Sequence, residues 1–500
     1  MPAINTAVLM NSSQYYLLAT FVVYLLILFV IGWFAWRNTH NHADYILGGR
    51  RLGRWTAALS AGASDMSGWL LLGLPGFAYL AGFEAIWIAA GLLAGTCLNW
   101  WFVAPRLREY SMASNNALTL PEFFEHHFND HTHSLRLIAA LFILFFYIFY
   151  TSSGLVAGGK LFESVFGLPY TWAVFTGTAA ILIYTVYGGF LAACWTDLFQ
   201  GLLMFFALVF LSLVGLKLAG GWDITVATMR VVDPSLIDMW HTVNMQPLNI
   251  MAICSLLGWG LGYFGQPHIL TRFMAIDSVN NISSASWIAI IWTATCLAAA
   301  LLIGYTGIAL LETPLKGSDA EKVYIELVAL ILQPVPAGIC LAALLAAIMS
   351  TADSQLLVAS SAITEDVYRT YFRQCATQQD LVRMGRITVI VIALLAMLLA
   401  MKYEQNVLEL VAYAWAGFGA AFGPALLLIL YWKGSTRRGA IAGIISGGLT
   451  VILWHRLEGG IFDLYELIPG FLLAILVNII VSLLDNTGNN LTQQYQSTTY

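Results

Sequence analysis

A single carboxylate lies among small and helix-breaking residues in a long apolar stretch of the chain. Asp65 stands in residues 60–69 (SAGASDMSGW), and Gly73, Pro75 and Gly76 follow shortly after. A charge at the centre of a bilayer costs about 2.5–3.5 kcal/mol or more, so such residues usually serve an ion or substrate path. The alternative is a carboxylate that reaches the membrane surface, but an Asp side chain is short for that. We expect Asp65 to lie at a functional break in a membrane helix.

Four glycines and a proline interrupt a second apolar stretch. It reads GWGLGYFGQPH over residues 258–268, which is a poor sequence for a continuous helix. Unwound backbone inside a membrane must line a cavity, where its carbonyl groups can hold an ion. Gly258 and Gly262 also have the four-residue spacing of a close helix-packing face. The two interpretations are compatible, and both stay open.

Hydroxyl groups cluster in a third apolar stretch. Ser350, Thr351 and Ser354 fall within about one helical turn. Hydroxyl and carbonyl oxygens suit a hard, weakly held monovalent cation. Such clusters more often donate hydrogen bonds to their own helix, but a neighbouring broken helix that carries Asp65 favours cation binding.

These residues belong to a chain whose composition indicates a membrane protein. Of its 500 residues 59% are hydrophobic and 10% are charged, whereas soluble domains are about 25% charged. The net charge of −5 without a basic domain excludes a nucleic-acid binder. We expect an all-α integral membrane protein with thirteen transmembrane helices. They span approximately 15–36, 56–82, 85–105, 135–161, 170–193, 198–219, 248–268, 285–311, 336–362, 386–402, 407–432, 439–455 and 466–484.

The distribution of Lys and Arg predicts the orientation. With the N-terminus outside, fifteen of the 22 Lys and Arg residues, Arg272 among them, fall in the loops on the cytosolic side. We therefore expect the N-terminal tail (1–14) outside and the C-terminal tail (485–500) in the cytosol.

The two interrupted stretches are the second and the seventh of the thirteen. A spacing of five is typical of an inverted repeat of five helices with a broken first helix in each half. The chain is then a single transport domain, 1–500. Its expected parts are an extra first helix with a cytosolic loop (15–55), a first repeat (56–219), a second repeat (248–432) and two peripheral helices (439–484).

Several long blocks of the chain resemble the sodium/solute symporter family, and within it the bacterial sodium/proline symporters. The resemblance covers nearly the whole length and implies thirteen helices in the LeuT-like inverted-repeat arrangement, in the bacterial cytoplasmic (inner) membrane. The blocks are 45–50 (YILGGR), 61–69 (AGASDMSGW), 195–197 (WTD), 258–270 (GWGLGYFGQPHIL), Ser350 and Thr351 with 361–366 (SAITED), and 413–424 (YAWAGFGAAFGP).

The resemblance implies two binding sites. A Na⁺ site between the second and ninth stretches would use the carbonyl groups of Ala63, Met66 and Ala347 and the hydroxyl groups of Ser350 and Thr351. A substrate pocket would use Asp65, Trp69, Tyr150, Trp259, Tyr263 and Pro267. Aromatic walls match the ring of proline and can face its ammonium group. Asp65 and Ser67 are expected to couple the two sites.

Two other charged residues each allow two interpretations. Asp197 lies on the sodium exit path or is the N-cap of the sixth stretch. Arg50 gates the cytosolic side or is a plain positive-inside anchor. The histidines of residues 126–133 have no cysteine near them, so we interpret their segment as amphipathic and not as a metal site.

The expected function is secondary active transport, in which Na⁺-coupled uptake of L-proline proceeds by alternating access. One alternative is a symporter of the same family for another small solute, such as pantothenate or another amino acid; a symporter-like sensor is less favoured. An enzyme is not expected, because the spans lack a Ser/His/Asp, HExxH or paired-carboxylate arrangement. L-Proline, Na⁺ and the lipid bilayer are the expected partners, with Na⁺ as coupling ion. No organic cofactor, nucleic acid or obligate protein partner is expected.

Overall fold

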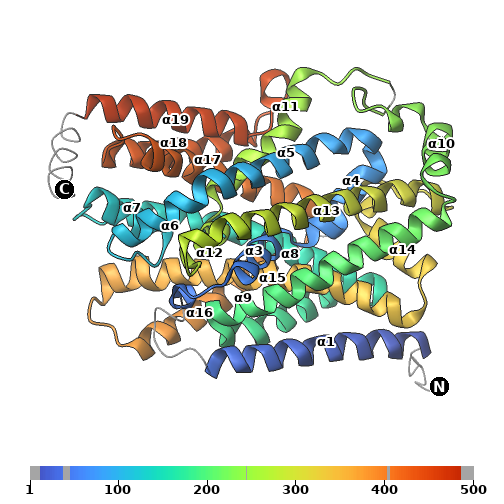
Figure 1. Cartoon of the computed structure of the whole chain (residues 1–500), viewed down its shortest axis with the longest axis horizontal. Coiled ribbons are helices and arrows are strands. Elements are labelled where there is room, and N and C mark those ends of the chain that lie inside the picture. Colours follow the sequence, from blue (N-terminus) through green and yellow to red (C-terminus); the bar gives the residue numbers. More distant parts are fainter. Residues whose placement is uncertain (1–11, 38–45, 244, 403–405, 486–500) are drawn as a thin grey trace, which may run out of the picture.

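The computed structural model describes residues 12–37, 46–243, 245–402 and 406–485. These residues are almost wholly helical, and among them no β-strand forms beyond two isolated bridges. Most of the long helices lie side by side along a common axis (Figure 1). The all-α fold class is therefore confirmed. Both predicted tails, 1–14 and 485–500, lie largely outside the described residues.

The helices follow one another along the whole chain. They are α1 (Ser12–Arg37), α3 (Arg54–Asp65), α4 (Leu74–Ala81), α5 (Ala85–Leu98), α6 (Ala104–Ala113), α7 (Leu120–Phe128), α8 (Ser134–Phe166), α9 (Tyr170–Leu218), α10 (Trp222–Val232), α11 (Ile250–Gly258), α12 (Pro267–Ala275), α13 (Ile282–Leu310), α14 (Val323–Ile331), α15 (Pro334–Ser361), α16 (Gln378–Ala400), α17 (Val407–Tyr431), α18 (Arg437–Trp454) and α19 (Leu467–Leu484). Short 3-10 and π segments join several of them, including η2 (Trp69–Gly73), η6 (Trp259–Gly265), η8 (Gly317–Lys322) and η9 (Ala362–Phe372).

Within the described residues, nine helical segments are long and apolar enough to cross a bilayer. Each of the thirteen expected stretches lies on helix, but some of them are divided into shorter pieces. The exact number of spans therefore stays a prediction.

The first expected helix break is confirmed. α3 ends at Asp65, the backbone of Met66 is non-helical (φ −82°, ψ 79°), and η2 begins at Trp69. The last carbonyl groups of α3 thereby lose the partners that a continuing helix would supply. They become available to side chains or to a ligand.

The second expected break is also confirmed. α11 ends at Gly258, the chain continues as the 3-10 segment η6, and Gln266 is extended before α12 begins at Pro267. The amide of Gln266 donates to the carbonyl oxygens of Gly262 (3.1 Å) and Trp415 (3.2 Å). This side chain therefore supplies a hydrogen bond to a carbonyl group that the break leaves without a helical partner.

The boundary between the fifth and sixth stretches differs from the prediction. It was expected between residues 193 and 198, but α9 kinks at Gly189, whose φ of 69° and ψ of 175° are not helical. Glycine adopts a positive φ at little cost, which fixes the kink there. Helical structure resumes at Phe190, so Asp197 lies inside a helix.

Three glycines let α5 and η6 approach closely. A Cβ atom on Gly95 would meet the carbonyl oxygen of Gly260, and a Cβ on Gly260 would meet that of Gly91. Contact between the backbones of α5 and η6 holds the second break against α5.

We expect Gly95→Ala to lower the unfolding free energy by about 1–3 kcal/mol, because a methyl group there forces the two backbones apart. The thermal unfolding midpoint of the purified protein in detergent measures the effect. Gly158→Ala is the matched control, since a Cβ at Gly158 in α8 meets nothing within 4 Å and Ala favours helix. Equal midpoints for the two variants would contradict the close approach.

Candidate functional site

Oxygen atoms of α3 and α15 meet beside the first break. The Ser350 hydroxyl donates to the carbonyl oxygen of Ala63 at 2.8 Å, and the Thr351 hydroxyl donates to the same oxygen at 3.4 Å. The Ser350 hydroxyl also lies 3.2 Å from the carbonyl oxygen of Ala347. All four residues are buried. The structure thus brings four of the five expected Na⁺ ligands into one group, the Ala63–Ser350–Thr351 cluster.

Met66, the fifth expected ligand, lies at the break itself. It is fully buried, and its N–H donates to the carbonyl oxygen of Gly62 at 2.8 Å. The part of its carbonyl group in ion binding stays a prediction.

The chemistry of the cluster suits a monovalent cation. Its oxygens are neutral, and a multivalent ion normally requires carboxylate, imidazole or thiolate ligands. Among the described residues, no group of three or more His, Cys, Asp or Glu could hold a metal ion. The hydroxyl groups that now bond to Ala63 keep lone pairs that can turn toward a cation.

Aromatic side chains surround Asp65. The Tyr263 hydroxyl donates to Asp65 Oδ2 at 2.7 Å. The Tyr150 hydroxyl (3.3 Å) and Trp69 Nε1 (3.1 Å) donate to the main-chain oxygen of Asp65. Asp65 Oδ1 is buried and has no hydrogen-bond partner within the protein. Four expected pocket residues, drawn from α3, η2, α8 and η6, therefore meet at the break.

Ser67 supports the same break. Its N–H donates to the carbonyl oxygen of Asp65 at 3.0 Å, and its side chain accepts from the N–H of Trp69 at 3.4 Å. Ser67 therefore fixes the turn between α3 and η2.

Two other expected pocket residues, Trp259 and Pro267, make contacts with other parts of the structure than Asp65. Trp259 stacks on Tyr465, with ring centroids 5.4 Å apart. Pro267 begins α12 and lines a separate narrow cavity with Phe190 and Asp366. Their role in substrate binding stays a prediction.

A buried ion pair joins α9 to α12. It lies beside Ser354, which follows Ser350 by one turn of α15. Arg272 of α12 contacts Asp197 Oδ2 at 3.2 Å, and both side chains are almost fully buried. The Ser60 hydroxyl donates to the same carboxylate oxygen at 2.6 Å. Arg272 also donates to the hydroxyl groups of Ser60 (3.1 Å) and Ser354 (2.5 Å).

This ion pair corrects two sequence interpretations. Arg272 was counted among the loop residues that set orientation, but it is a buried partner of Asp197. Asp197 is no N-cap, because it lies within α9, eight residues beyond the kink at Gly189. From composition alone, an Arg near the end of a helix is expected to be exposed. The pairing of Arg272 with Asp197 becomes visible only in the folded structure.

Arg50 ties three segments together. Its guanidinium donates to Ser111 Oγ (3.1 Å) and to the carbonyl oxygens of Met274 (2.7 Å) and Ala117 (2.8 Å). Burial lowers its pKa to about 10, so it is charged at neutral pH. These contacts join Arg50 to the ends of α6 and α12, and its role as a gate or as an anchor stays a prediction.

Comparison with known sequences identifies close relatives. The sodium:solute symporter family model matches residues 45–447. The sodium/proline symporters of Salmonella typhimurium and Escherichia coli are each 50% identical to the chain over 473 residues, covering 94% of this chain and 93% of the relative. A high-affinity proline transporter of Bacillus subtilis is 46% identical over 91% of this chain and 95% of its own.

Solved structures agree on the fold. A Na⁺-coupled sialic acid symporter in its substrate-bound outward-open state has a TM-score of 0.77 at 18% identity, covering 95% of this chain and 98% of that chain. Mhp1, a nucleobase-cation-symport-1 transporter, has a TM-score of 0.55 at 15% identity, covering 89% and 96%. The architecture is that of the LeuT-like transporters, as the two breaks predict.

We expect Arg272→Gln to lower the unfolding free energy by about 3–5 kcal/mol, because it leaves Asp197 buried without its counter-charge. Thermal unfolding in detergent measures the loss. The double variant Arg272→Gln, Asp197→Asn removes both charges and is expected to regain part of the stability. A double variant at least as unstable as Arg272→Gln would show that the pair does not act as a unit.

Proposed function

The chain belongs to the sodium:solute symporter family, and we propose that it couples the uptake of L-proline to the entry of Na⁺ across the bacterial cytoplasmic membrane. One observation carries this proposal: the hydroxyl groups of Ser350 and Thr351 meet the carbonyl group of Ala63 directly beside a helix break. The sodium/proline symporters of two enteric bacteria, which share half of its residues over 94% of its length, support proline as the substrate.

Sodium binding would join α3 to α15. The ion would take the place of the two hydroxyl protons at the carbonyl oxygen of Ala63, with Ser350 and Thr351 turning lone pairs toward it. Its charge would also stabilise the nearby Asp65 carboxylate, for which burial is costly. The broken helix, and with it the Asp65 group, would then be held in one arrangement.

The substrate would bind on the other side of the break. The rings of Trp69, Tyr150 and Tyr263 offer apolar and cation-attracting faces to a cyclic amino acid. Asp65 Oδ1 has no protein partner, so it can accept a hydrogen bond from a secondary ammonium group. Because Na⁺ and substrate act on the same segment, each would raise the affinity for the other by the same factor.

Release would take the ion toward the Asp197–Arg272 pair. Ser354 stands one helical turn beyond Ser350 on α15 and contacts Arg272, while Asp197 Oδ1 is buried without a partner. These groups continue the line of oxygens from the cluster. The membrane potential would favour the inward step by about 2.3 kcal/mol per charge and 100 mV.

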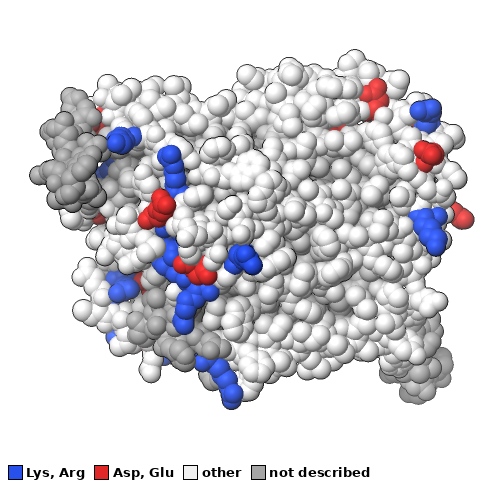
Figure 2. Space-filling model, in the orientation of Figure 1, with Lys and Arg blue, Asp and Glu red and all other residues white. Residues whose placement is uncertain are grey.

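The orientation with the N-terminus outside and the C-terminus in the cytosol also belongs to this proposal. Figure 2 shows that, on the face in view, Lys and Arg gather mainly toward the end where α6 and α7 lie in Figure 1. Positive residues concentrate on the cytosolic side of membrane proteins. We further propose that the chain is a transporter without catalytic activity, and that it needs no organic cofactor and no obligate protein partner.

We expect proteoliposomes that contain the purified protein to accumulate labelled L-proline under an inward Na⁺ gradient but not when K⁺ replaces Na⁺. The double variant Ser350→Ala, Thr351→Ala is expected to lose this accumulation, because it removes both hydroxyl ligands. Thr178→Ala, which removes a buried hydroxyl that bonds only within α9, is the matched control and should transport normally. Uptake of proline that is indifferent to Na⁺ would contradict the coupling.

Competition distinguishes proline from other solutes in the same experiment. A fully folded protein that takes up no proline, but that transports pantothenate or another amino acid with Na⁺, would support the alternative substrate and overturn the pocket assignment.

Native Cys375 tests the orientation, because it is exposed in the segment between η9 and α16. In a background whose other five cysteines are serine, a membrane-impermeant maleimide should label Cys375 only after cells are permeabilised. Thr313→Cys, at an exposed position between α13 and η8, should be labelled in intact cells once Cys375 is also serine. The opposite pattern would reverse the orientation.

A further inference from the structure

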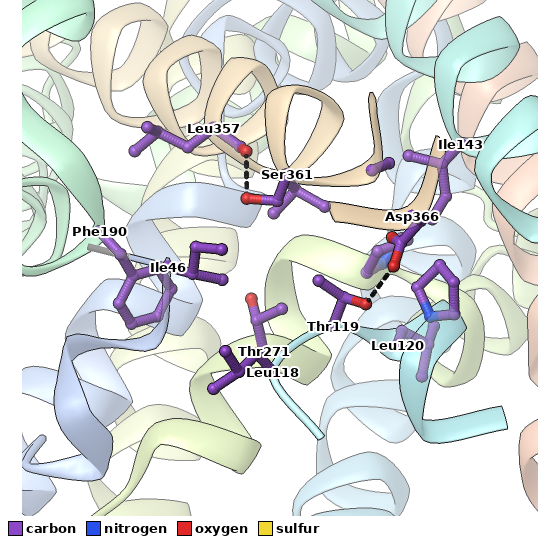
Figure 3. A pocket seen from close by; sticks show the side chains of 14 residues that line it. Ile46, Leu118, Thr119, Leu120, Ile143, Phe190, Thr271, Leu357, Ser361 and Asp366 are labelled. Carbon is purple, nitrogen blue, oxygen red and sulfur yellow. Dashed lines mark hydrogen bonds between the residues drawn. The ribbon is translucent and has the colours of Figure 1, made fainter. Parts of the chain in front are cut away.

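A narrow cavity lies between α7, α8, α12 and α15 (Figure 3). Its volume is about 20 Å³, which accommodates about one water-sized body. An amino acid is therefore too large for it, whereas a small cation fits. Its polar lining comes from Thr119, Thr271, Ser361 and Asp366.

Asp366, one of the residues that line this cavity, carries an unsatisfied carboxylate oxygen. The side chain is fully buried, and Oδ1 accepts from Arg136 Nε at 2.7 Å and from the Thr119 hydroxyl at 2.9 Å. Oδ2 is buried and has no hydrogen-bond partner. A buried carboxylate oxygen without a donor is costly, and a cation would satisfy it.

Negative charge exceeds positive charge around Asp366. Arg136 also contacts Glu122 and Glu125, each at 3.3 Å, so one guanidinium faces three carboxylates. The surrounding end of the molecule is otherwise rich in Lys and Arg (Figure 2). This local excess of acid favours a cation over an anion or a neutral ligand.

Two hydroxyl groups of the cavity can serve as further ligands. Thr271 donates to the carbonyl oxygen of His268, and Ser361 donates to that of Leu357, each at 2.9 Å. Each hydroxyl donates its proton within its own helix and keeps lone pairs for a cation. The set of one carboxylate and several hydroxyl oxygens is typical of a hard-cation site.

The cavity also lies in line with the Ala63–Ser350–Thr351 cluster. Ser361 follows Ser350 by eleven residues on α15. Eleven residues make three helical turns plus about 20°, so both residues lie on nearly the same face of the helix, about 16 Å apart along its axis. The ring of Phe190 lines the cavity and also lies 5.0 Å from the guanidinium of Arg272. Phe190 is thus a shared wall between the cavity and the Asp197–Arg272 pair.

We propose that this cavity, with Asp366 as its anionic ligand, is a second and weaker site for a monovalent cation, which Na⁺ occupies between the Ala63–Ser350–Thr351 cluster and the cytosol. The direction of movement rests on the proposed function and its orientation. The binding chemistry does not, because it follows from the cavity and its ligands.

The site is tested first without proline or transport. Sodium NMR line broadening is measured on the double variant Ser350→Ala, Thr351→Ala, from which the coupling cluster has been removed. We expect residual broadening that saturates as the Na⁺ concentration is raised through the millimolar range, and its loss when Asp366→Asn is added. Glu122→Gln is the matched control, because it removes another carboxylate from Arg136 but leaves Asp366 and its oxygens in place, and it should reduce the broadening by much less than Asp366→Asn does.

The transport role is tested in inside-out and right-side-out vesicles. Asp366→Asn is expected to raise the Na⁺ concentration for half-maximal proline transport about tenfold at the cytosolic face, since a bond to a charged group is lost. The external value should stay within about twofold, a limit well below that tenfold shift. Glu122→Gln, which leaves Asp366 in place, should shift the cytosolic value by much less than tenfold. Ser361→Ala is the second variant, and should shift the same face if Asp366→Asn fails to fold.

Equal shifts at both faces, no shift at either, or the same effect from Glu122→Gln would overturn the proposal. So would residual broadening that survives Asp366→Asn. If the wild-type protein transports no proline but the broadening depends on Asp366, the proposed substrate fails and the cation site stands.

Discussion

The rest of the structure depends on the rule that backbone polar groups inside a bilayer must find partners within the protein. Both helix breaks violate the regular helical pattern, and side chains repair each of them. Ser350 and Thr351 satisfy the carbonyl of Ala63, Tyr150 and Trp69 satisfy that of Asp65, and Gln266 satisfies that of Gly262. Ser350, Thr351, Tyr150 and Trp69 are also the groups proposed to bind the ion or the substrate, so stability of the fold and the proposed recognition would have one physical origin. A side chain that bonds to the unpaired backbone when no ligand is present would also be positioned to contact a ligand that binds there.

Buried charge is the second element that the fold must accommodate, and three ion pairs hold part of it. Asp197 faces Arg272, Lys160 faces Glu321, and Asp366 faces Arg136. Each pair joins segments that are distant in the chain, and removal of one partner would leave an expensive unpaired ion. The pairs lie at different levels of the helix bundle, which indicates that polar contacts fix the relative positions of helices where apolar packing alone would let them slide.

Local composition was enough to predict the helical class, both breaks and the hydroxyl cluster. Glycine and proline mark where a helix cannot continue, and Ser350 and Thr351 stand out in an apolar segment. Long-range partners could not be predicted in this way. Arg272 looked like a loop residue because the expected seventh stretch ended at residue 268, and Asp197 looked like a helix cap because the kink at Gly189 was not recognised. The stacking of Trp259 on Tyr465 depends on a residue just before α19, more than 200 residues later in the chain, which no local pattern reveals.

The internal hydrogen bonds of the Ala63–Ser350–Thr351 cluster have a kinetic consequence. The proposed ion capture there would be an exchange reaction, since the cation would have to displace two hydroxyl–carbonyl bonds worth about 0.5–1.5 kcal/mol each. A fully preorganised cage without such competitors would bind more tightly by about five- to 150-fold, which is the conversion of about 1–3 kcal/mol, but it would also hold its ion longer. With these internal hydrogen bonds the cluster would hold its ion for a shorter time and release it faster. The hydrogen bonds would re-form as the ion leaves, so the empty site would keep its polar groups paired.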